Sequence, residues 1–294
     1  MLTSPCIGCC QIGDKTGLCV GCARTRDEIG AWRAADEDFR QRVWSTLPER
    51  RAALGIRLHR LNLTAEALRD FVAGSFRRGV WSVGVPDAVA AFRPGDVEAV
   101  EVQREGGAIR CRSSEGALAF DIDTSVRAFA VGDRGGGEIL VLATPRGAVS
   151  GEPTSVLSPL GPDKQAVREQ DRAGLLYDFG LKRVGARFCI RTVEPALAAH
   201  LDSLAGRDWA DVLPLVRDEL LRASPHRVVL TPIGRIEVFS PIPPSDAVSP
   251  DGPHTHFLPT FLEEGRETPA GIATPQAYVA CALFHPRVLG SLCV

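Results

Sequence analysis

Five of the nine cysteines lie within the first 22 residues of the chain. Four of them are spaced C-x3-C-x8-C-x2-C, with a glycine inside each pair: Cys6, Cys10, Cys19 and Cys22. Close pairs of cysteines separated by a longer gap are typical of four-thiolate metal sites. Four thiolates suit a tetrahedral zinc ion or an iron–sulfur cluster, because both bind sulfur well. The spacing predicts a metal site and leaves the metal open.

Cys9 is the fifth cysteine of this segment. It is adjacent to Cys10 on the backbone, so its side chain is expected to point elsewhere, as a spare thiol or a substitute ligand. The other four cysteines are widely separated, and we expect them not to bind the metal: Cys111, Cys189, Cys281 and Cys293.

Around the cysteines, residues 4–54 carry a short set of further motifs. These are Ser4-Pro5-Cys6, Leu18-Cys19, Gly21-Cys22, Arg24-Thr25, Asp27-Glu28-Ile29 and Trp32. In these motifs the segment resembles the bacterial DUF1289 family, whose members are usually described as predicted iron–sulfur proteins. Where that family has an aliphatic residue this chain has Cys9. The resemblance favours an iron–sulfur cluster over zinc.

The composition is that of an ordinary globular protein, with 45% hydrophobic and 24% charged residues in 294. A formal net charge of -2 gives no electrostatic footprint for nucleic acid or an anionic membrane, so neither is an expected partner. The first residues lack the features of a signal peptide, and no stretch approaches the ~18 apolar residues of a membrane span. We expect a cytoplasmic protein, in which clustered cysteines bind metal rather than form disulfides.

The sequence predicts an α+β fold in three parts. Residues 1–58 form a cysteine-rich module with a four-cysteine metal knuckle and short helices, residues 59–79 a helical connector, and residues 80–294 a larger mixed domain with an antiparallel sheet and helices. In the module, Thr25 and Glu28 form a capping box that starts a helix, and Phe39, Val43 and Leu47 mark a second helix that ends before Pro48. The module is small, so metal binding should supply much of its folding free energy.

In the larger domain, residues 80–142 alternate and carry glycine-rich loops, which predicts antiparallel strands. Helices are expected at residues 159–178, at 195–205 and after Asp208, and a hairpin at residues 227–239 around Gly234. No G-x-G-x-x-G or G-x4-G-K-[ST] motif accompanies the glycines, so they do not indicate a phosphate-binding loop.

A second informative stretch runs from Ser249 to Pro259, where prolines and Gly252 stiffen a loop around His254 and His256. A helix is expected directly after it, at residues 260–264. Residues two apart on an extended backbone point to one side, so the two histidines suit a metal site, contacts to a substrate or anion, or structural hydrogen bonds. With Glu237, Arg235 and Arg227 they form a candidate second site for a small-molecule or anionic ligand. Residues from about 80 to 290 resemble the DUF6925 family, which has no assigned activity and implies no catalytic residue.

Two classes of function follow from these patterns. The first is a protein with an N-terminal iron–sulfur cluster whose larger domain serves redox or metal-dependent chemistry on a small molecule. The second is a non-catalytic zinc- or iron-binding regulatory or interaction protein. No Ser-His-Asp, G-x-S-x-G, H-E-x-x-H or kinase motif set decides between them, and the sequence sets neither the substrate nor the oligomeric state.

Overall fold

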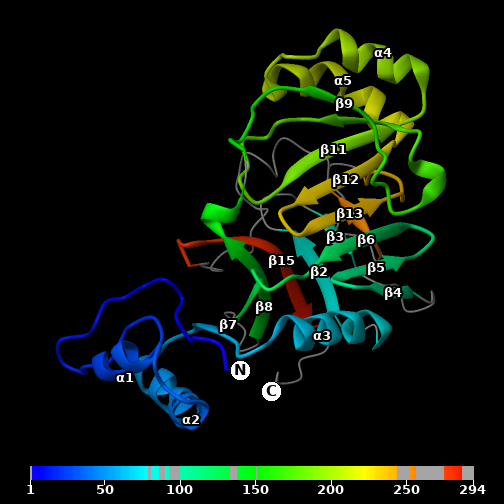
Figure 1. Cartoon of the computed structure of the whole chain (residues 1–294). Coiled ribbons are helices and arrows are strands. Elements are labelled where there is room, and N and C mark those ends of the chain that lie inside the picture. The colour runs from blue at the N-terminus through cyan, green and yellow to red at the C-terminus, as the bar shows by residue number, and fades with distance from the viewer. Residues whose placement is uncertain are drawn as a thin grey trace.

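The computed structural model describes residues 2–78, 81–85, 90–92, 100–132, 138–149, 151–243, 252–255 and 275–286. Its described part combines antiparallel sheets with short helices, which confirms the α+β class (Figure 1). The cysteine-rich segment lies at one end of the molecule, beside the larger two-sheet body.

The N-terminal module holds two helices, α1 (Arg26–Ala31) and α2 (Glu37–Leu54). The expected capping box is present: Thr25 Oγ1 accepts from the amide of Glu28, and Glu28 accepts from the amide of Thr25. The expected end of the second helix at Pro48 is wrong, because α2 continues for six residues beyond it and ends at Gly55 with a φ of 64°. Ala23, Val43 and Leu47 form the small buried core of this module.

One sheet of the larger body has seven described strands, all antiparallel to their neighbours. Its order is β1 (Leu58–Arg60), β7 (Arg127–Gly132), β8 (Glu138–Pro145), β15 (Tyr278–Pro286), β2 (Trp81–Val85), β3 (Ala90–Phe92) and β14 (His254–Thr255). Strand β1 pairs with β7, so the chain enters this sheet directly after the N-terminal module.

The second sheet has eight described strands. Its order is β4 (Glu101–Glu105), β5 (Ala108–Arg112), β6 (Gly116–Asp121), β13 (Gly234–Val238), β12 (His226–Thr231), β11 (Arg187–Thr192), β10 (Leu175–Asp178) and β9 (Ser158–Pro162). The expected β12–β13 hairpin is confirmed. At its turn, a Cβ on Gly234 would lie 1.9 Å from the carbonyl oxygen of Ala119 on β6, so only glycine fits there.

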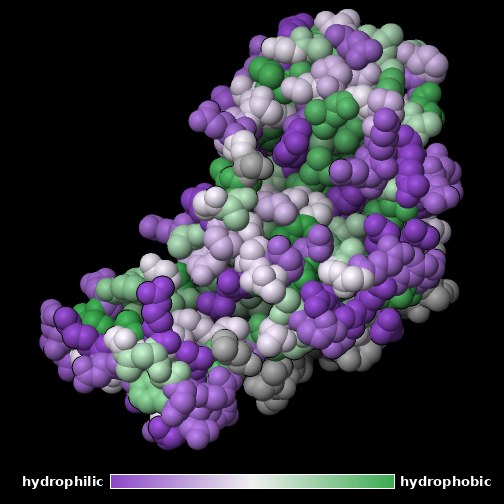
Figure 2. All heavy atoms as spheres, in the orientation of Figure 1, coloured by the Kyte–Doolittle hydropathy of each residue, from purple (hydrophilic) through white to green (hydrophobic). Residues whose placement is uncertain are grey.

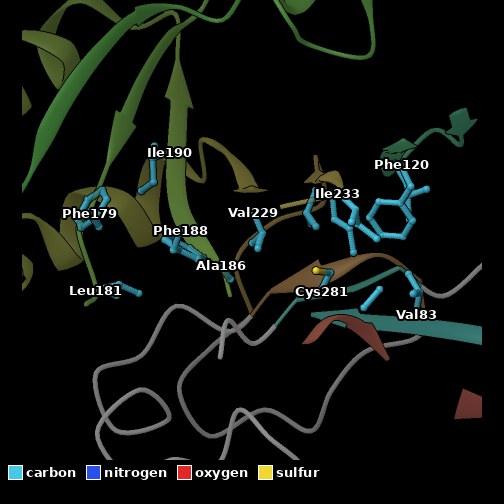
Figure 3. Close-up of a cluster of buried hydrophobic side chains, with 14 of the residues drawn as sticks. Val83, Phe120, Phe179, Leu181, Ala186, Phe188, Ile190, Val229, Ile233 and Cys281 are labelled. Carbon is cyan, nitrogen blue, oxygen red and sulfur yellow. The ribbon is translucent and has the colours of Figure 1, made fainter. Parts of the chain in front are cut away.

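Helices α3 (Ala65–Arg78), α4 (Pro195–Ser203) and α5 (Trp209–Ala223) pack on the main hydrophobic core. Their apolar residues, such as Phe76, Leu201 and Leu220, share this core with side chains of both sheets. Figure 3 shows Phe120, Val229 and Ile190 of the eight-stranded sheet in the same cluster as Val83 and Cys281 of the seven-stranded sheet. The core therefore lies between the two sheets. Each sheet has a second face that points away from this core.

The helix expected at residues 159–178 is wrong. This segment forms β9, the 3-10 helix η2 (Glu169–Asp171) and β10. Its Asp163 and Asp171 are buried and bind arginines of the sheet, so tertiary ion pairs outweigh the helical spacing of its charges.

Three other expectations fall outside the described residues: the loop at 133–137, the helix at 260–264 and most of the histidine loop. The helices at 195–205 and after Asp208 are confirmed as α4 and α5. In the described part of the chain, no helix combines the length and apolar character that crossing a membrane requires. The face drawn in Figure 2 mixes hydrophilic and hydrophobic residues without one dominant apolar area.

Candidate metal centre and the charged face of the second sheet

In the structure Cys10 is paired with Cys6, and Cys19 with Cys22. The Cys10 thiol interacts with Cys6, Cys22 and Cys9, and the Cys19 thiol interacts with Cys22. The pKa of Cys10 is raised, first by the charge of Cys6 and then by burial and a hydrogen bond with Cys6. Such mutual repulsion between thiolates is what a bound cation relieves.

Backbone amides point at one sulfur of each pair. The amide of Gly8 donates to Cys6 Sγ at 3.3 Å. Burial raises the pKa of the Cys19 thiol, while hydrogen bonds from the amides of Gly21 and Cys22 act in the opposite direction. In both pairs, then, the amide two residues after the first cysteine faces its sulfur. Donors of this kind favour the thiolate, which is the form that binds metal.

Glycines shape both cysteine turns. A Cβ on Gly21 would lie 3.0 Å from the Cys9 carbonyl oxygen, and Gly8 has a φ of 86°. Between the turns, residues 12–19 fold back on themselves through an antiparallel bridge from Ile12 to Cys19. Gly21 is therefore required for the packing of the two turns, and Gly8 for the backbone conformation of the first turn.

Cationic side chains surround the buried half of the site. Arg24 Nε donates to Cys22 Sγ at 3.4 Å. Arg51 is 7% exposed, and its Nε and Nη2 have no hydrogen-bond partner among the described residues. Burial lowers the pKa of Arg51 to about 10, and the charge of Cys22 opposes that shift. The two Arg51 nitrogens without a hydrogen-bond acceptor fit a negatively charged group bound by the thiolates. Such a group would supply the negative charge that the buried guanidinium lacks.

As the side chains stand, no group of three or more His, Cys, Asp or Glu residues in the described ranges has the arrangement of a metal site. Cys19 and Cys22 are buried, whereas Cys9 and Cys10 are exposed. Cys111, Cys189 and Cys281 are buried in the larger body, where burial raises the pKa of each thiol, and Cys293 lies outside the described residues. These three are unreactive core thiols.

The residues of the candidate second site are divided between two faces of the eight-stranded sheet. Arg235 and Glu237 lie on one face, 3.5 Å apart between Nη1 and Oε1. Arg227 pairs with Val238 across the β12–β13 ladder, so it lies on the opposite, core side. There it is fully buried, and its Nε donates to the hydroxyl of Thr255 at 3.0 Å.

His254 precedes Thr255, the residue that Arg227 contacts. It belongs to β14, is 4% exposed, and its Nδ1 lies 2.9 Å from the carbonyl oxygen of Gly252. His256 lies outside the described residues. The structure thus joins Arg235 with Glu237, whereas Arg227 contacts Thr255 of the other sheet.

A buried ion network lies around Glu237, and the sequence did not reveal it. Arg191 Nη1 donates to Glu237 Oε2 at 2.8 Å and to Asp163 Oδ2 at 2.9 Å, and its Nη2 donates to Asp171 at 3.0 Å. Arg235 adds a second contact to Asp163 at 2.8 Å. The charges come from distant parts of the chain, so only their sheet pairing brings them together.

Two family models match the chain. One, described as "Protein of unknown function (DUF1289)", matches residues 4–51, and the other, described as "Family of unknown function (DUF6925)", matches residues 65–288. The chain belongs to the DUF6925 family. The DUF6925 match starts at the first residue of α3 and includes the core between the sheets and the Glu237 network. The DUF1289 match contains all four cysteines of the candidate metal centre. Both resemblances expected from the sequence are confirmed. No curated protein and no solved structure matches the chain.

Proposed function

We propose that residues 4–51 bind a metal centre through the thiolates of Cys6, Cys10, Cys19 and Cys22, and that this centre is an iron–sulfur cluster. The supporting observation is that hydrogen-bond donors and positively charged side chains lie next to the cysteine sulfurs. Amides face Cys6 and Cys19, and Arg24 contacts Cys22. The unpartnered nitrogens of Arg51 lie in the same buried region, where a dianionic cluster with four thiolates would satisfy them.

A bound cluster would supply one-electron transfer. The chain's own residues hold the thiolates, keep water from the buried pair and balance the charge. Zinc bound by the same thiolates would make the module structural, which is the alternative function of a non-catalytic regulatory or interaction protein.

We further propose that the larger domain works on a small molecule with the help of this centre. The segment next to Cys6 touches that domain: Ile7 packs with Phe129, Val141 and Leu283 on the outer face of the seven-stranded sheet. A Cβ on Gly8 would lie 2.7 Å from the Cβ of Ala277, the residue directly before β15. The first cysteine turn therefore contacts the start of this strand. An electron carrier at this contact would have a short route into the larger domain. Reduced thiols of this number also suit a reducing compartment such as the cytoplasm.

Anaerobic purification of the full chain with elemental analysis and visible absorption tests the metal. A brown protein with iron and acid-labile sulfide that bleaches on reduction supports the cluster. A colourless protein with one equivalent of zinc supports the structural alternative. Protein that carries neither metal in stoichiometric amount after anaerobic preparation and reconstitution would contradict a metal centre of either kind.

A further inference from the structure

The second face of the eight-stranded sheet holds a cavity of about 720 Å³. Strands β5, β6, β12 and β13 form its floor, and residues 148–149, 164–167 and 184–187 border it. This volume is in the range of pockets that enclose small organic molecules. The floor residues Ala119, Leu230 and Arg235 share the face of the sheet opposite the main core, whereas Phe120 and Ala186 of the lining also belong to that core.

Much of the cavity lining is apolar. Ala108 and Ala119 lie on neighbouring strands of the floor, Leu230 lies on β12, and Val149 and Val184 border the cavity from loops. The small alanine side chains leave the space open. An occupant with an apolar body would bury its surface here, which contributes roughly 25 cal/mol for each Å² removed from water.

The charged residues of the lining are mostly cationic. Arg110, Lys164, Arg172, Arg187 and Arg235 line the cavity, and Asp121 is the carboxylate among its described lining residues. Within the described chain, the Lys164 ammonium has no ion pair. Arg110 and Arg172 pair with Glu105 and Glu169, whose side chains are 59% and 84% exposed. Exposed pairs of this kind contribute at most about 1 kcal/mol, so both guanidinium groups are available to an anion in the cavity.

Arg235 is the buried cation of this lining. It is 5% exposed, and Asp163 and Glu237 both hold its Nη1. Its Nε is buried and has no hydrogen-bond partner in the described part of the chain. A buried donor without an acceptor costs about 1–3 kcal/mol. Asp163 and Glu237 fix the guanidinium of Arg235 at the edge of the cavity.

We propose that this cavity binds a small organic anion, with its acidic group at Lys164 and Arg172, beside Arg235, and its apolar body over Ala119 and Leu230. The site differs from the candidate site expected from the sequence, since it uses Arg235 without Arg227 or His254. It also does not depend on the proposed metal centre, because no cysteine of the N-terminal module lines it.

The test uses 8-anilinonaphthalene-1-sulfonate as the anionic probe and N-phenyl-1-naphthylamine as its neutral counterpart, with the full-length protein. We expect saturable binding of one sulfonate probe per chain, at least tenfold tighter than binding of the neutral probe. Lys164→Gln combined with Arg172→Gln should weaken sulfonate binding at least fivefold and leave neutral-probe binding unchanged. Both side chains are exposed, so the variant is expected to fold. Arg217→Gln is the matched control, because Arg217 is exposed on α5, which packs on the core side of the sheet.

Two further measurements locate the probe. Ala119→Leu fills the floor of the cavity and should weaken both probes. Excess 1-naphthoate should displace the sulfonate probe, whereas inorganic phosphate at the same concentration should not, because phosphate lacks the apolar body. Equal binding of both probes, wild-type affinity in the double variant, full retention in Ala119→Leu, or equal displacement by phosphate would each overturn the proposal.

Discussion

The guanidinium of Arg24 contacts both Cys22 and Trp32. Its Nε lies 3.4 Å from Cys22 Sγ, and its Cζ lies 4.9 Å from the centroid of the Trp32 ring. All three residues belong to the motifs through which the segment resembles DUF1289. The contact gives the motif a physical meaning: Trp32 holds a buried cation against the last cysteine of the set. The same motif supplies Thr25 and Glu28, whose capping box starts α1 directly after the cysteine turn.

Single serine substitutions identify the ligands. We expect Cys6→Ser, Cys10→Ser, Cys19→Ser and Cys22→Ser each to lose stoichiometric metal, because a lost thiolate opens a four-thiolate site to water. Cys9→Ser should keep the metal, and buried Cys111→Ser is the control for substitution elsewhere. Elemental analysis after anaerobic gel filtration is the measurement. Full metal retention in Cys19→Ser or Cys22→Ser would remove these residues from the ligand set.

Replacing Arg51 by methionine should have opposite effects on the metal-free and metal-loaded proteins. Without metal, Arg51 is a buried cation with two unpartnered nitrogens, so Arg51→Met is expected to raise the free energy of unfolding by about 1–3 kcal/mol. With metal, the substitution removes a counter-charge of the thiolates and should speed metal loss to a chelator. Arg42→Met, on the exposed side of α2, is the control. If Arg51→Met stabilises both forms or destabilises both forms, Arg51 does not act as a counter-charge of the metal site.

The two glycines at positions 21 and 30 should respond differently to alanine. A Cβ on Gly21 would crowd the Cys9 carbonyl oxygen and the Ile7 side chain at 3.0 Å, so Gly21→Ala should separate the cysteine turns and weaken metal retention. A Cβ on Gly30 meets no atom within 4 Å inside α1, so Gly30→Ala should stabilise the helix by up to about 1 kcal/mol. Metal content and thermal unfolding of the two variants check this. Equal metal retention in both would contradict the packing argument.

Loss of Glu237 should be among the most destabilising substitutions in the larger domain. Its carboxylate is fully buried, accepts from Arg191 at 2.8 Å and from the amide of Val167 at 3.0 Å, and balances a buried cation. Glu237→Ala is expected to lower the free energy of unfolding by about 3–5 kcal/mol. Glu237→Gln, which keeps an acceptor for the Val167 amide, should cost less. Urea unfolding is the measurement, with exposed Glu152→Ala as the control. A loss below about 1 kcal/mol in Glu237→Ala would contradict this account.

Acid should destabilise the protein partly through His226. Burial, followed by the charge of Arg191, lowers the pKa of His226 from 6.5 to about 4. The unfolded chain therefore binds this proton at a higher pH than the folded chain, and stability falls as the pH drops from 6.5 to 4. The full shift corresponds to at most roughly 3 kcal/mol. We expect His226→Asn to flatten the pH dependence of the unfolding free energy in this interval, with a residual slope from His59, whose pKa burial also lowers to about 4. An unchanged slope in His226→Asn would contradict the assignment.

Local features of this protein follow from the sequence alone. The capping box, the helix after Asp208 and the β12–β13 hairpin depend on residues close together in the chain, so their patterns are readable from the sequence. The cysteine spacing likewise depends on one short segment. Its two pairs adjoin in the structure because the intervening residues turn back through local bridges.

The tertiary structure decided everything that needs distant residues. The helix expected at residues 159–178 is displaced by strands because Asp163 and Asp171 both pair with Arg191 on β11. Arg227 and Arg235 look equivalent in the hairpin, yet the pairing register places them on opposite faces of the sheet. The cavity beside Arg235 is formed by strands and loops, some of which are more than 100 residues apart along the chain. Sequence periodicity gives the face of a strand, whereas the register of its neighbours gives the residues that share this face.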